Sequence, residues 1–563
     1  MNRWVLAAAL SCLACALLLP GEALLEFLLA GDESRRGALG RGVDLLRGML
    51  ALTGLVLVLV ERVAPRGDGG EPLLTTGIRS PERLDASALW ALGGLAVLAL
   101  ALRTPGLGAG LSFDEIDTLV HYARKEPREI LSTFDSQNQH LLYSLLARGS
   151  FAVFGESAWA VRLPAVLLGV LGVLALHRLA RLVTDGREAI FAAALLAVSY
   201  HHVWFSQDAR GYTGLLLFTL LGSAEFLRMC ASSQARGVGA PLRYGAWMAL
   251  ATWIHATAVF AVAAHVLVWA GCAWRARGRR VAAAHHQVLS GFVMATLFSL
   301  VLHALVLPQY VATLLAPTMP GAKVEWKDPA WLVAETLRGL SQGVPGGAFT
   351  LAGGLAVLVL GVRSYWRQSR ALTGTFLLGV VVTAAVLLAT RHNLWPRMFF
   401  FAAGFAVLVA VRGVVEWVRI FSFGQLAGLL PRLTTAALAL ACLMSAATVP
   451  VAWLPKQDYE GAQAHIDRER RPGDAVATVD MTVMPYRDYY DCAWTPVDSL
   501  EALESLERAH PRTWIVYCTP TRLKAAEPEI WARIEREYRV QATCWGTLGG
   551  SEVVVALRDV GAK

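Results

Sequence analysis

The feature that most constrains this chain is its succession of long apolar runs separated by short segments that carry arginine. A helix needs about 20 apolar residues to cross a bilayer, and by that measure the sequence contains about thirteen such runs. Hydrophobic residues make up 55% of the chain and charged residues only 17%, whereas a soluble domain carries roughly a quarter charged residues. These values exclude a soluble enzyme, a disordered chain and a disulfide-stapled secreted module. The predicted fold class is an α-helical polytopic membrane protein with about 13 transmembrane helices.

Arginine placement predicts the orientation of these helices. The net charge of +8 (51 Lys and Arg against 43 Asp and Glu) gathers in one alternating set of short loops, which the positive-inside rule assigns to the cytoplasm. Arginines between spans explain this charge better than nucleic-acid binding does. We expect a multi-pass protein of the plasma membrane (bacterial inner membrane) with a cytoplasmic N-terminus and an uncleaved first span. The extracytoplasmic side then receives residues 104–160, 207–211, 308–347, 391–397 and everything after Trp453.

Three regions follow from this pattern. Residues 1–84 form an N-terminal transmembrane hairpin with a cytoplasmic loop, and residues 85–453 form the main membrane domain with the long outer loop 104–160. Residues 454–563 change character, because apolar runs shorten and charges and prolines return. The pattern there predicts a small extracytoplasmic α/β domain, with strands at 475–479, 513–518 and 552–557 and helices at 499–509 and 528–538.

Two local features leave alternatives open. The run from Tyr244 to Ala273 has arginines on both sides, so we expect the chain to turn at Trp253-Ile254-His255 and form two short helices. In the C-terminal region, one pair among Cys492, Cys518 and Cys544 forms a disulfide or all three stay buried free thiols; their spacing fits no metal motif.

The sharpest candidate for chemistry is the acidic segment Ser112–Asp117, just after the third span. Asp114, Glu115 and Asp117 would repel one another in a dry site, which raises at least one pKa and suits a general base. The alternative is a solvated loop, or a helix that begins near Glu115 with Asp114 as its N-cap.

Four more polar clusters fall on the predicted outer side. His140 precedes an amphipathic run over 141–154; it suits anion binding or orientation of a carboxylate, or is a plain helix cap. The tight turn 206–212 contains Asp208, Arg210 and Tyr212, and Arg210 suits a phosphate unless it pairs with Asp208. The other two are His255 and the segment with Arg391, His392 and Arg397, whose cations are alternatively interfacial anchors.

These motifs, in this order, resemble the GT-C class of membrane glycosyltransferases. The resemblance is strongest to the family 39-like group related to protein mannosyltransferases and aminoarabinose transferases. It is carried by Asp114-Glu115, by Asn138…Tyr143, by Phe154-Gly155-Glu156-Ser157…Arg162-Leu163-Pro164, by the turn 206–212, similar to the group's "SQEARxY", and by Arg391…Phe399. It covers roughly residues 85–420. The sequence departs from the group at Gln139-His140-Leu141-Leu142-Tyr143, where many members have His-Pro-Pro-Leu-Tyr, and in its two additional N-terminal spans.

The resemblance implies a GT-C-like fold and inverting sugar transfer from a polyprenyl-phosphate donor to a hydroxyl of a lipid, glycan or protein acceptor. It implies that Asp114 is the general base and that Glu115 positions the acceptor or a metal. Arg210, Arg391 and either Arg397 or His392 would stabilise the departing phosphate. The remaining substrate-binding candidates are His140, Tyr143, Asp208, Tyr212 and His255.

Other interpretations compete with this one. A secondary transporter or lipid flippase is the main alternative, but transporters place charges near the bilayer midplane and often contain inverted repeats, and no repeat is visible here. A non-catalytic scaffold is the third interpretation. Adjacent carboxylates are compatible with a divalent metal or with none, and no other cofactor is predicted.

Overall fold

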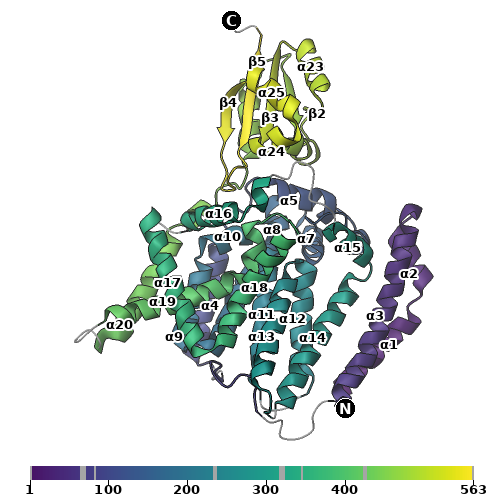
Figure 1. The fold of residues 1–563 in the computed structure, drawn as a ribbon. Helices are drawn as coiled ribbons and strands as arrows, with labels where there is room; N and C mark the ends of the chain where they lie inside the picture. The colour runs from purple at the N-terminus through teal and green to yellow at the C-terminus, as the bar shows by residue number, and fades with distance from the viewer. Residues whose placement is uncertain are drawn as a thin grey trace.

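The computed structural model describes residues 3–63, 71–80, 84–232, 237–279, 281–315, 324–343, 347–422 and 428–560. It is a helical body with a small sheet domain at one end (Figure 1). In the described ranges, eight helices are long and apolar enough to cross a membrane, or up to ten if each of two bent helix pairs is one span. A multi-pass helical membrane protein is therefore confirmed, whereas the number thirteen stays a prediction.

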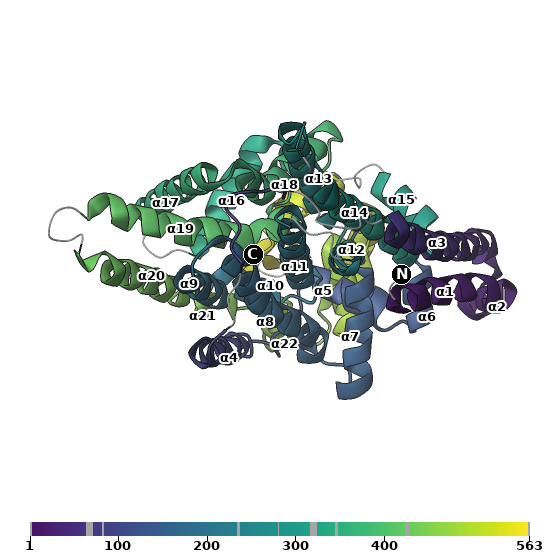
Figure 2. The same ribbon diagram turned by 90° about the horizontal axis from the view of Figure 1, so that it is seen from below.

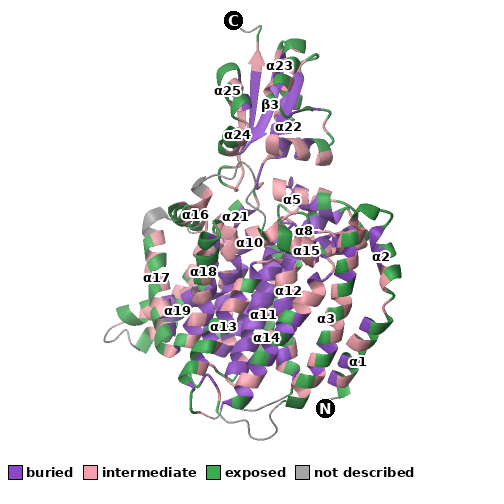
Figure 3. Ribbon diagram, turned by 45° about the vertical axis from the view of Figure 1, so that its right-hand side comes forward, coloured by how far each residue is buried: buried purple, intermediate pink, exposed green. Residues whose placement is uncertain are grey.

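The centre of the body is built around α11 (Tyr212–Cys230), which is buried along nearly its whole length (Figure 3). Its neighbours include α8 (Ala158–Val183) and α12 (Gly239–Ile254). The predicted turn at His255 is confirmed, because α12 ends at Ile254 and α13 begins at Ala258. The rest of the body comprises α4 (Ala86–Ala101), α9 (Gly186–Ala197), α10 (Tyr200–Ser206), α13 (Ala258–Arg275), α14 (Ala282–His303), α15 (Leu307–Leu315), α16 (Pro329–Gln342), α17 (Gly347–Gln368), α18 (Arg370–Ala389), the 3₁₀-helix η4 (Pro396–Ala402), α19 (Ala403–Phe421), α20 (Leu430–Ala446) and α21 (Val449–Ala452).

The N-terminal hairpin lies at one end of the body, opposite α17, α19 and α20 (Figure 2). It consists of α1 (Arg3–Leu18), α2 (Gly21–Leu29) and α3 (Arg36–Val63), and the axes of α1 and α2 differ by 75°. Gly54 lets α1 and α3 approach closely, because a Cβ at Gly54 would lie 2.8 Å from the carbonyl oxygen of Ala9. On its other side α3 packs on α14 and α15.

The predicted outer loop 104–160 folds into short helices. These are α5 (Phe113–Asp117), a π-helical turn η2 (Thr118–Ala123), α6 (Pro127–Ser132) and α7 (Leu141–Phe154). The N-cap of α5 is Ser112, and it forms a capping box with Glu115. The expectation that Asp114 caps a helix beginning near Glu115 is therefore wrong, whereas the predicted helix over 141–154 is confirmed.

The C-terminal domain contains a five-stranded sheet with strand order β2-β1-β3-β5-β4. Strands β1 and β2 and strands β1 and β3 pair in parallel, whereas β5 is antiparallel to both β3 and β4. All eight cysteines are free thiols; of the three in this domain only Cys518 is buried, whereas Cys492 and Cys544 are partly exposed, so the second cysteine alternative holds for the free thiols but not for the burial of all three. The elements are α22 (Tyr459–Glu469), β1 (Ala475–Val479), β2 (Thr495–Val497), α23 (Leu500–Ala509), β3 (Arg512–Cys518), α24 (Pro520–Ala526), α25 (Pro528–Glu537), β4 (Arg539–Cys544) and β5 (Val553–Asp559).

Candidate active site

Segments that are far apart in the sequence meet at the end of the body that faces the C-terminal domain (Figure 1). The acidic helix α5 contacts the turn between α10 and α11. That turn binds His140 at the start of α7, and the ring of His140 lies against His255 in the turn between α12 and α13. The segment η4 joins them through an ion pair between Arg397 and Asp114. The structure therefore brings together Asp114, Glu115, His140, Asp208, Arg210, Tyr212, His255 and Arg397.

Glu115 is the centre of a buried ion network. Its carboxylate is completely buried and accepts two hydrogen bonds from Arg162, at 2.7 and 2.8 Å. It also accepts the backbone N–H of Ala209 at 2.9 Å and both the N–H and the hydroxyl of Ser112 at 3.0 Å. Burial opposes the charged form, but Arg162 and then Lys456 (3.6 Å) hold the pKa of Glu115 well below its usual range. Glu115 thus ties α5 and α8 to the turn 206–212.

Asp114 faces the other way and stays partly open to solvent. Its Oδ2 lies 2.8 Å from Nη1 of Arg397, and about a third of each side chain is exposed (30% and 34%). Burial raises the pKa of Asp114, but Arg397 and Arg210 outweigh it and leave the pKa below its ordinary value. The predicted pKa rise from mutual repulsion in this segment is therefore wrong for both Asp114 and Glu115, because cations from distant segments neutralise them.

Arg210 is buried, with 3% of its surface exposed, and its hydrogen-bond donors are poorly used. Its Nε has no partner, and its Nη1 reaches only the carbonyl oxygen of Asp114 at 3.5 Å. Its Nη2 lies 3.3 Å from Nε2 of His140. In the described residues no carboxylate oxygen lies within 4 Å of this guanidinium, so the alternative of an Asp208–Arg210 ion pair is not what the structure has.

His140 provides a second N–H group beside the guanidinium of Arg210. Its Nδ1 accepts the backbone N–H of Gly211 at 2.8 Å. Burial, and after it the charge of Arg210, lowers the pKa of His140 well below its ordinary value, so the ring is neutral. A neutral ring that accepts at Nδ1 carries its proton on Nε2. The N–H groups of His140 and Arg210 therefore converge with no acceptor between them, which is the arrangement an oxyanion requires.

Asp208 is a buried carboxylate of the same cluster, with 5% of its surface exposed. Burial raises its pKa to about 7, helped by the charge of Glu115 and opposed by Lys456. Its environment thus differs from that of Asp114, although both carboxylates belong to one cluster.

Two cations that sequence reasoning did not select support the turn 206–212. Lys456, 5% exposed, donates to the carbonyl oxygen of Gln207 and lies over the ring of Trp204. Arg103 is completely buried and donates to Ser206 Oγ at 2.9 Å and to the carbonyl oxygens of Ala99 and Ala197. The sequence signal for both is a lone cation at the end of an apolar run. Arg103 ends the first span of the predicted membrane domain, and Lys456 follows its last span.

Aromatic rings form one wall of the cluster. The ring centroids of His140 and His255 are 4.6 Å apart, and those of Tyr212 and His255 are 5.1 Å apart. Burial lowers the pKa of His255 to about 3, so this ring is neutral as well. Beside it lies a cavity of about 30 Å³, and both amide atoms of the buried Gln139 that line it lack partners. Sequence reasoning missed Gln139, because one amide in a polar loop gives no signal.

Three candidates lie outside this arrangement. Tyr143 is completely buried, and its hydroxyl donates to the carbonyl oxygen of Val161 at 2.7 Å, so it is not free for a substrate. Arg391 is exposed and ends α18 with a φ of 54°. Among the described residues, no hydrogen bond or ion pair joins Arg391 or its neighbour His392 to Asp114 or Arg210.

Metal ligation finds little support in the geometry. The described residues contain no group of three or more His, Cys, Asp or Glu side chains that could hold an ion. Glu115 is held by Arg162 and Lys456, which a divalent ion would have to displace. The residues present therefore do not fit a metal at Glu115.

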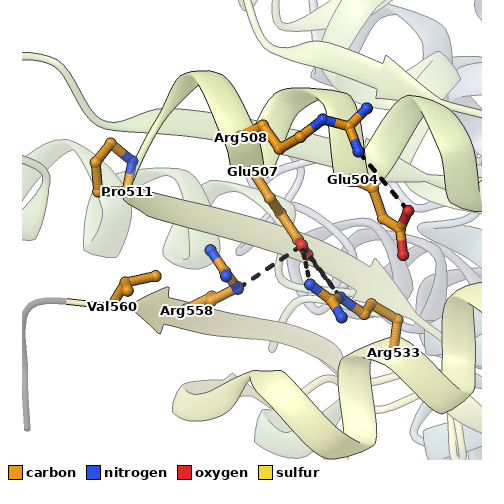
Figure 4. A pocket seen from close by; sticks show the side chains of 7 residues that line it. All are labelled: Glu504, Glu507, Arg508, Pro511, Arg533, Arg558 and Val560. Carbon is orange, nitrogen blue, oxygen red and sulfur yellow. Dashed lines mark hydrogen bonds and ion pairs between the residues drawn. The ribbon is translucent and has the colours of Figure 1, made fainter.

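The C-terminal domain has a larger cavity, of about 330 Å³, at the end of the domain away from the helical body (Figures 1 and 4). Each arginine there has a carboxylate within 4 Å: Arg508 with Glu504, Arg533 with Glu507 and Arg558 with Glu507 and Glu537. None of the predicted site residues lines it. Because each of these arginines has an acid of the same domain nearby, we place the chemistry at the cluster of Asp114, Glu115, His140, Asp208, Arg210 and Arg397 instead, called the Asp114–Arg210 cluster below.

A family comparison agrees with this choice. Residues 138–303 match the family model described as dolichyl-phosphate-mannose-protein mannosyltransferase. The matched range contains His140, Asp208, Arg210, Tyr212 and His255. Over this range the predicted resemblance to the protein mannosyltransferases is confirmed. No curated protein sequence matches the chain.

Several solved structures of membrane glycosyltransferases share the general arrangement. ArnT from Cupriavidus metallidurans in the apo state is 13% identical, with a TM-score of 0.47, over 84% of this chain and 98% of that chain. An Archaeoglobus fulgidus oligosaccharyltransferase tethered to an acceptor peptide is 12% identical, with a TM-score of 0.48, over 83% and 74%. Arabinosyltransferase EmbB from Mycobacterium smegmatis is 16% identical, with a TM-score of 0.41, over 79% and 45%. At these scores the likenesses add no functional argument.

Proposed function

We propose that this protein is an inverting glycosyltransferase that moves a sugar from a polyprenyl-phosphate donor to an acceptor hydroxyl at the extracytoplasmic face of the membrane. The single observation that carries the proposal is the buried guanidinium of Arg210, whose Nε lacks a partner and whose Nη2 meets the Nε2–H of neutral His140. A buried cation with unused donors is costly unless a ligand supplies the missing acceptor. A phosphate on a membrane-embedded lipid is such an acceptor, and the matched family is named for a dolichyl-phosphate sugar.

In the proposed reaction the bond between the anomeric carbon and the phosphate oxygen breaks, while the acceptor oxygen bonds to the opposite face of that carbon. The electron pair of the broken bond stays on the lipid phosphate, which gains negative charge. Arg210 and His140 donate to that charge as it develops, and Arg397 lies close enough to Asp114 to add to the same field. Preformed donors in a water-poor site need no reorganisation when the bond breaks.

Asp114 takes the acceptor proton in this scheme. Its lowered pKa keeps it ionised at neutral pH, so it is always available as a base. A weakly basic carboxylate suffices, because the acceptor hydroxyl becomes strongly acidic only once its oxygen has begun to bond to the sugar. Glu115 acts through its neighbours: it fixes α5 and the turn 206–212, and thereby places Asp114 next to Arg210.

The acceptor is a lipid, a glycan or a protein, and the sugar a hexose or a pentose; the cluster favours none of these. The catalytic region in this proposal is 85–453, with the 454–563 domain on the extracytoplasmic side. A transporter or flippase receives no support from the candidate site, since its charged residues lie at one end of the helices and not at mid-span.

The test is Asp114→Asn, which keeps the shape of the side chain and removes the base. We expect transfer from a labelled polyprenyl-phosphate sugar to fall about 100-fold or more in membranes that contain the variant. The matched control is Glu126→Gln, an exposed acid of the same loop that forms an ion pair with Arg128; this variant should transfer normally. Normal turnover by Asp114→Asn would remove the general base from the proposal.

A further inference from the structure

The N-terminal hairpin touches the outer loop directly. The guanidinium of Arg35, at the start of α3, donates through Nη2 to the carbonyl oxygen of Ser132 at 2.5 Å, to Ser132 Oγ at 2.9 Å and to Thr133 Oγ1 at 2.8 Å. A second contact lies nearby, where Arg128 of α6 stacks on the ring of Phe27 of α2. The hairpin is thus attached to the segment that ends α6.

The same segment is held from its other side by α15. Gln309 accepts the backbone N–H of Phe134 at 2.7 Å. The rings of Phe134 and Tyr310 pack with centroids 4.6 Å apart. The segment Ser132–Phe134 is therefore held by two elements, the hairpin and α15, and α15 itself packs on α3 of the hairpin.

The segment Ser132–Phe134 ends six residues before His140. Phe134 and Tyr310 line the small cavity that Gln139 and His140 also line. His140 in turn accepts from Gly211 and meets Arg210. A shift of Ser132–Phe134 therefore moves the ring that completes the pair of donors, and a displacement of about 1 Å in a catalytic group is enough to cost two orders of magnitude in rate.

We propose that the N-terminal hairpin is a brace for the active site, and that Arg35 is a positioning residue that holds the segment 132–140 so that His140 faces Arg210. The role in catalysis rests on the proposed function, whereas the mechanical coupling does not. Residues 1–84 lie outside the range that resembles the glycosyltransferase group. The proposed coupling would make this region contribute to the same reaction.

Two positions in the hairpin allow matched tests. Arg36 follows Arg35 but pairs with Glu26 and Glu33 of the hairpin itself, so Arg36→Ala is the control for Arg35→Ala. Gly42 lies where a Cβ would come within 2.5 Å of the carbonyl oxygen of Leu305, just before α15, so Gly42→Ala pushes the hairpin away from the body. Gly48, on the same helix, has open space around it and serves as its control.

The first measurement is hydrogen–deuterium exchange of the full-length protein in lipid nanodiscs. We expect Arg35→Ala and Gly42→Ala to speed exchange over residues 132–140 about tenfold, the equivalent of one charge-assisted hydrogen bond. Exchange over 113–117 should not change, and Arg36→Ala and Gly48→Ala should behave as the wild type. Unchanged exchange over 132–140 in both Arg35→Ala and Gly42→Ala overturns the brace.

The second measurement is transfer from a labelled polyprenyl-phosphate sugar. Arg35→Ala should lower kcat/KM for the donor about tenfold and leave the KM for the acceptor unchanged, and Arg35→Lys should recover part of the loss because it keeps a cationic donor. Equal loss in Arg36→Ala, or a loss confined to the acceptor KM, contradicts the positioning role. If the wild type transfers no sugar, the proposed function fails and the exchange measurement alone decides the brace.

Discussion

Two regions of this molecule contain several arginines, and they differ in whether each arginine has a carboxylate nearby. In the C-terminal domain each arginine of the cavity has a carboxylate within 4 Å, and Glu507 is held by Arg533 and by the hydroxyl of Tyr538. In the Asp114–Arg210 cluster, Arg210 has no such partner in the described residues, because the nearby Asp114 binds Arg397. The arginines of the first group are thus neutralised by acids of their own domain, although Nε and Nη1 of Arg558 make no hydrogen bond. Under the proposed function a lipid phosphate neutralises Arg210, so the missing carboxylate, and not the size of a cavity, distinguishes the two regions.

The largest effect should be on stability, and it should come from Glu115, which holds the Asp114–Arg210 cluster together. Glu115→Gln keeps the shape but leaves Arg162, with a side chain only 3% exposed, without its counter-charge. Breaking one side of a buried ion pair costs about 3–5 kcal/mol, so we expect a large drop in the thermal unfolding temperature of the purified protein. The control is Glu504→Gln in the C-terminal cavity, whose ion pair with Arg508 is long and exposed and should matter little. Equal stability of the two variants would contradict the comparison.

The next effect separates function from stability. Arg210→Ala removes the unmatched cation, so we expect sugar transfer to fall about 100-fold while the unfolding temperature changes little. Arg508→Ala, in the balanced group, should leave transfer unchanged. Transfer assays and thermal unfolding on the same preparations check both statements, and a loss of stability without a loss of transfer would show that Arg210 is structural.

The smallest effect is one of pH. The folded pKa of Asp208 is raised to about 7, against about 3.9 in an unfolded chain. Between these values the folded state binds the extra proton, so stability falls as pH rises from about 4 to about 7 and is level above that. Asp208→Asn should remove this part of the slope. Unfolding temperatures of both proteins between pH 4 and 8 provide the measurement, and parallel curves would mean that Asp208 does not titrate in this range.

Much of the fold is readable from local patterns. The strand Ala475–Val479 and the helix Leu141–Phe154 lie where periodicity predicts them, and the chain turns at His255 as the flanking arginines require. Strand β4 was not predicted, although Val540, Ala542 and Cys544 alternate with polar residues; it is a short edge strand with no buried residue. Spacing could not show that α9 and α10 differ in direction by 56°, since a continuous apolar run hides a bend.

Sequence patterns predict many residues of the candidate site, but not Lys456, Arg103 or Gln139 and not how the charges pair. Topology alone places Asp114, Arg210 and Arg397 at one face. Their pairing depends on residues hundreds of positions apart in the chain, which no local pattern encodes. The pattern Ser112-Phe113-Asp114-Glu115 is typical of the capping box that fixes Glu115. The same residues also indicate a cluster of acids that repel one another, so the sequence did not decide between the two.

The position of Lys456 has a consequence for biogenesis. This lysine follows the last long apolar helix and supplies a counter-charge to Glu115, more than three hundred residues earlier in the chain. During synthesis Glu115 therefore has Arg162 as its partner first and gains Lys456 only after the last long apolar helix has been made. A chain that stops before this point would hold every candidate residue named from the sequence and would still lack the second cation beside Glu115.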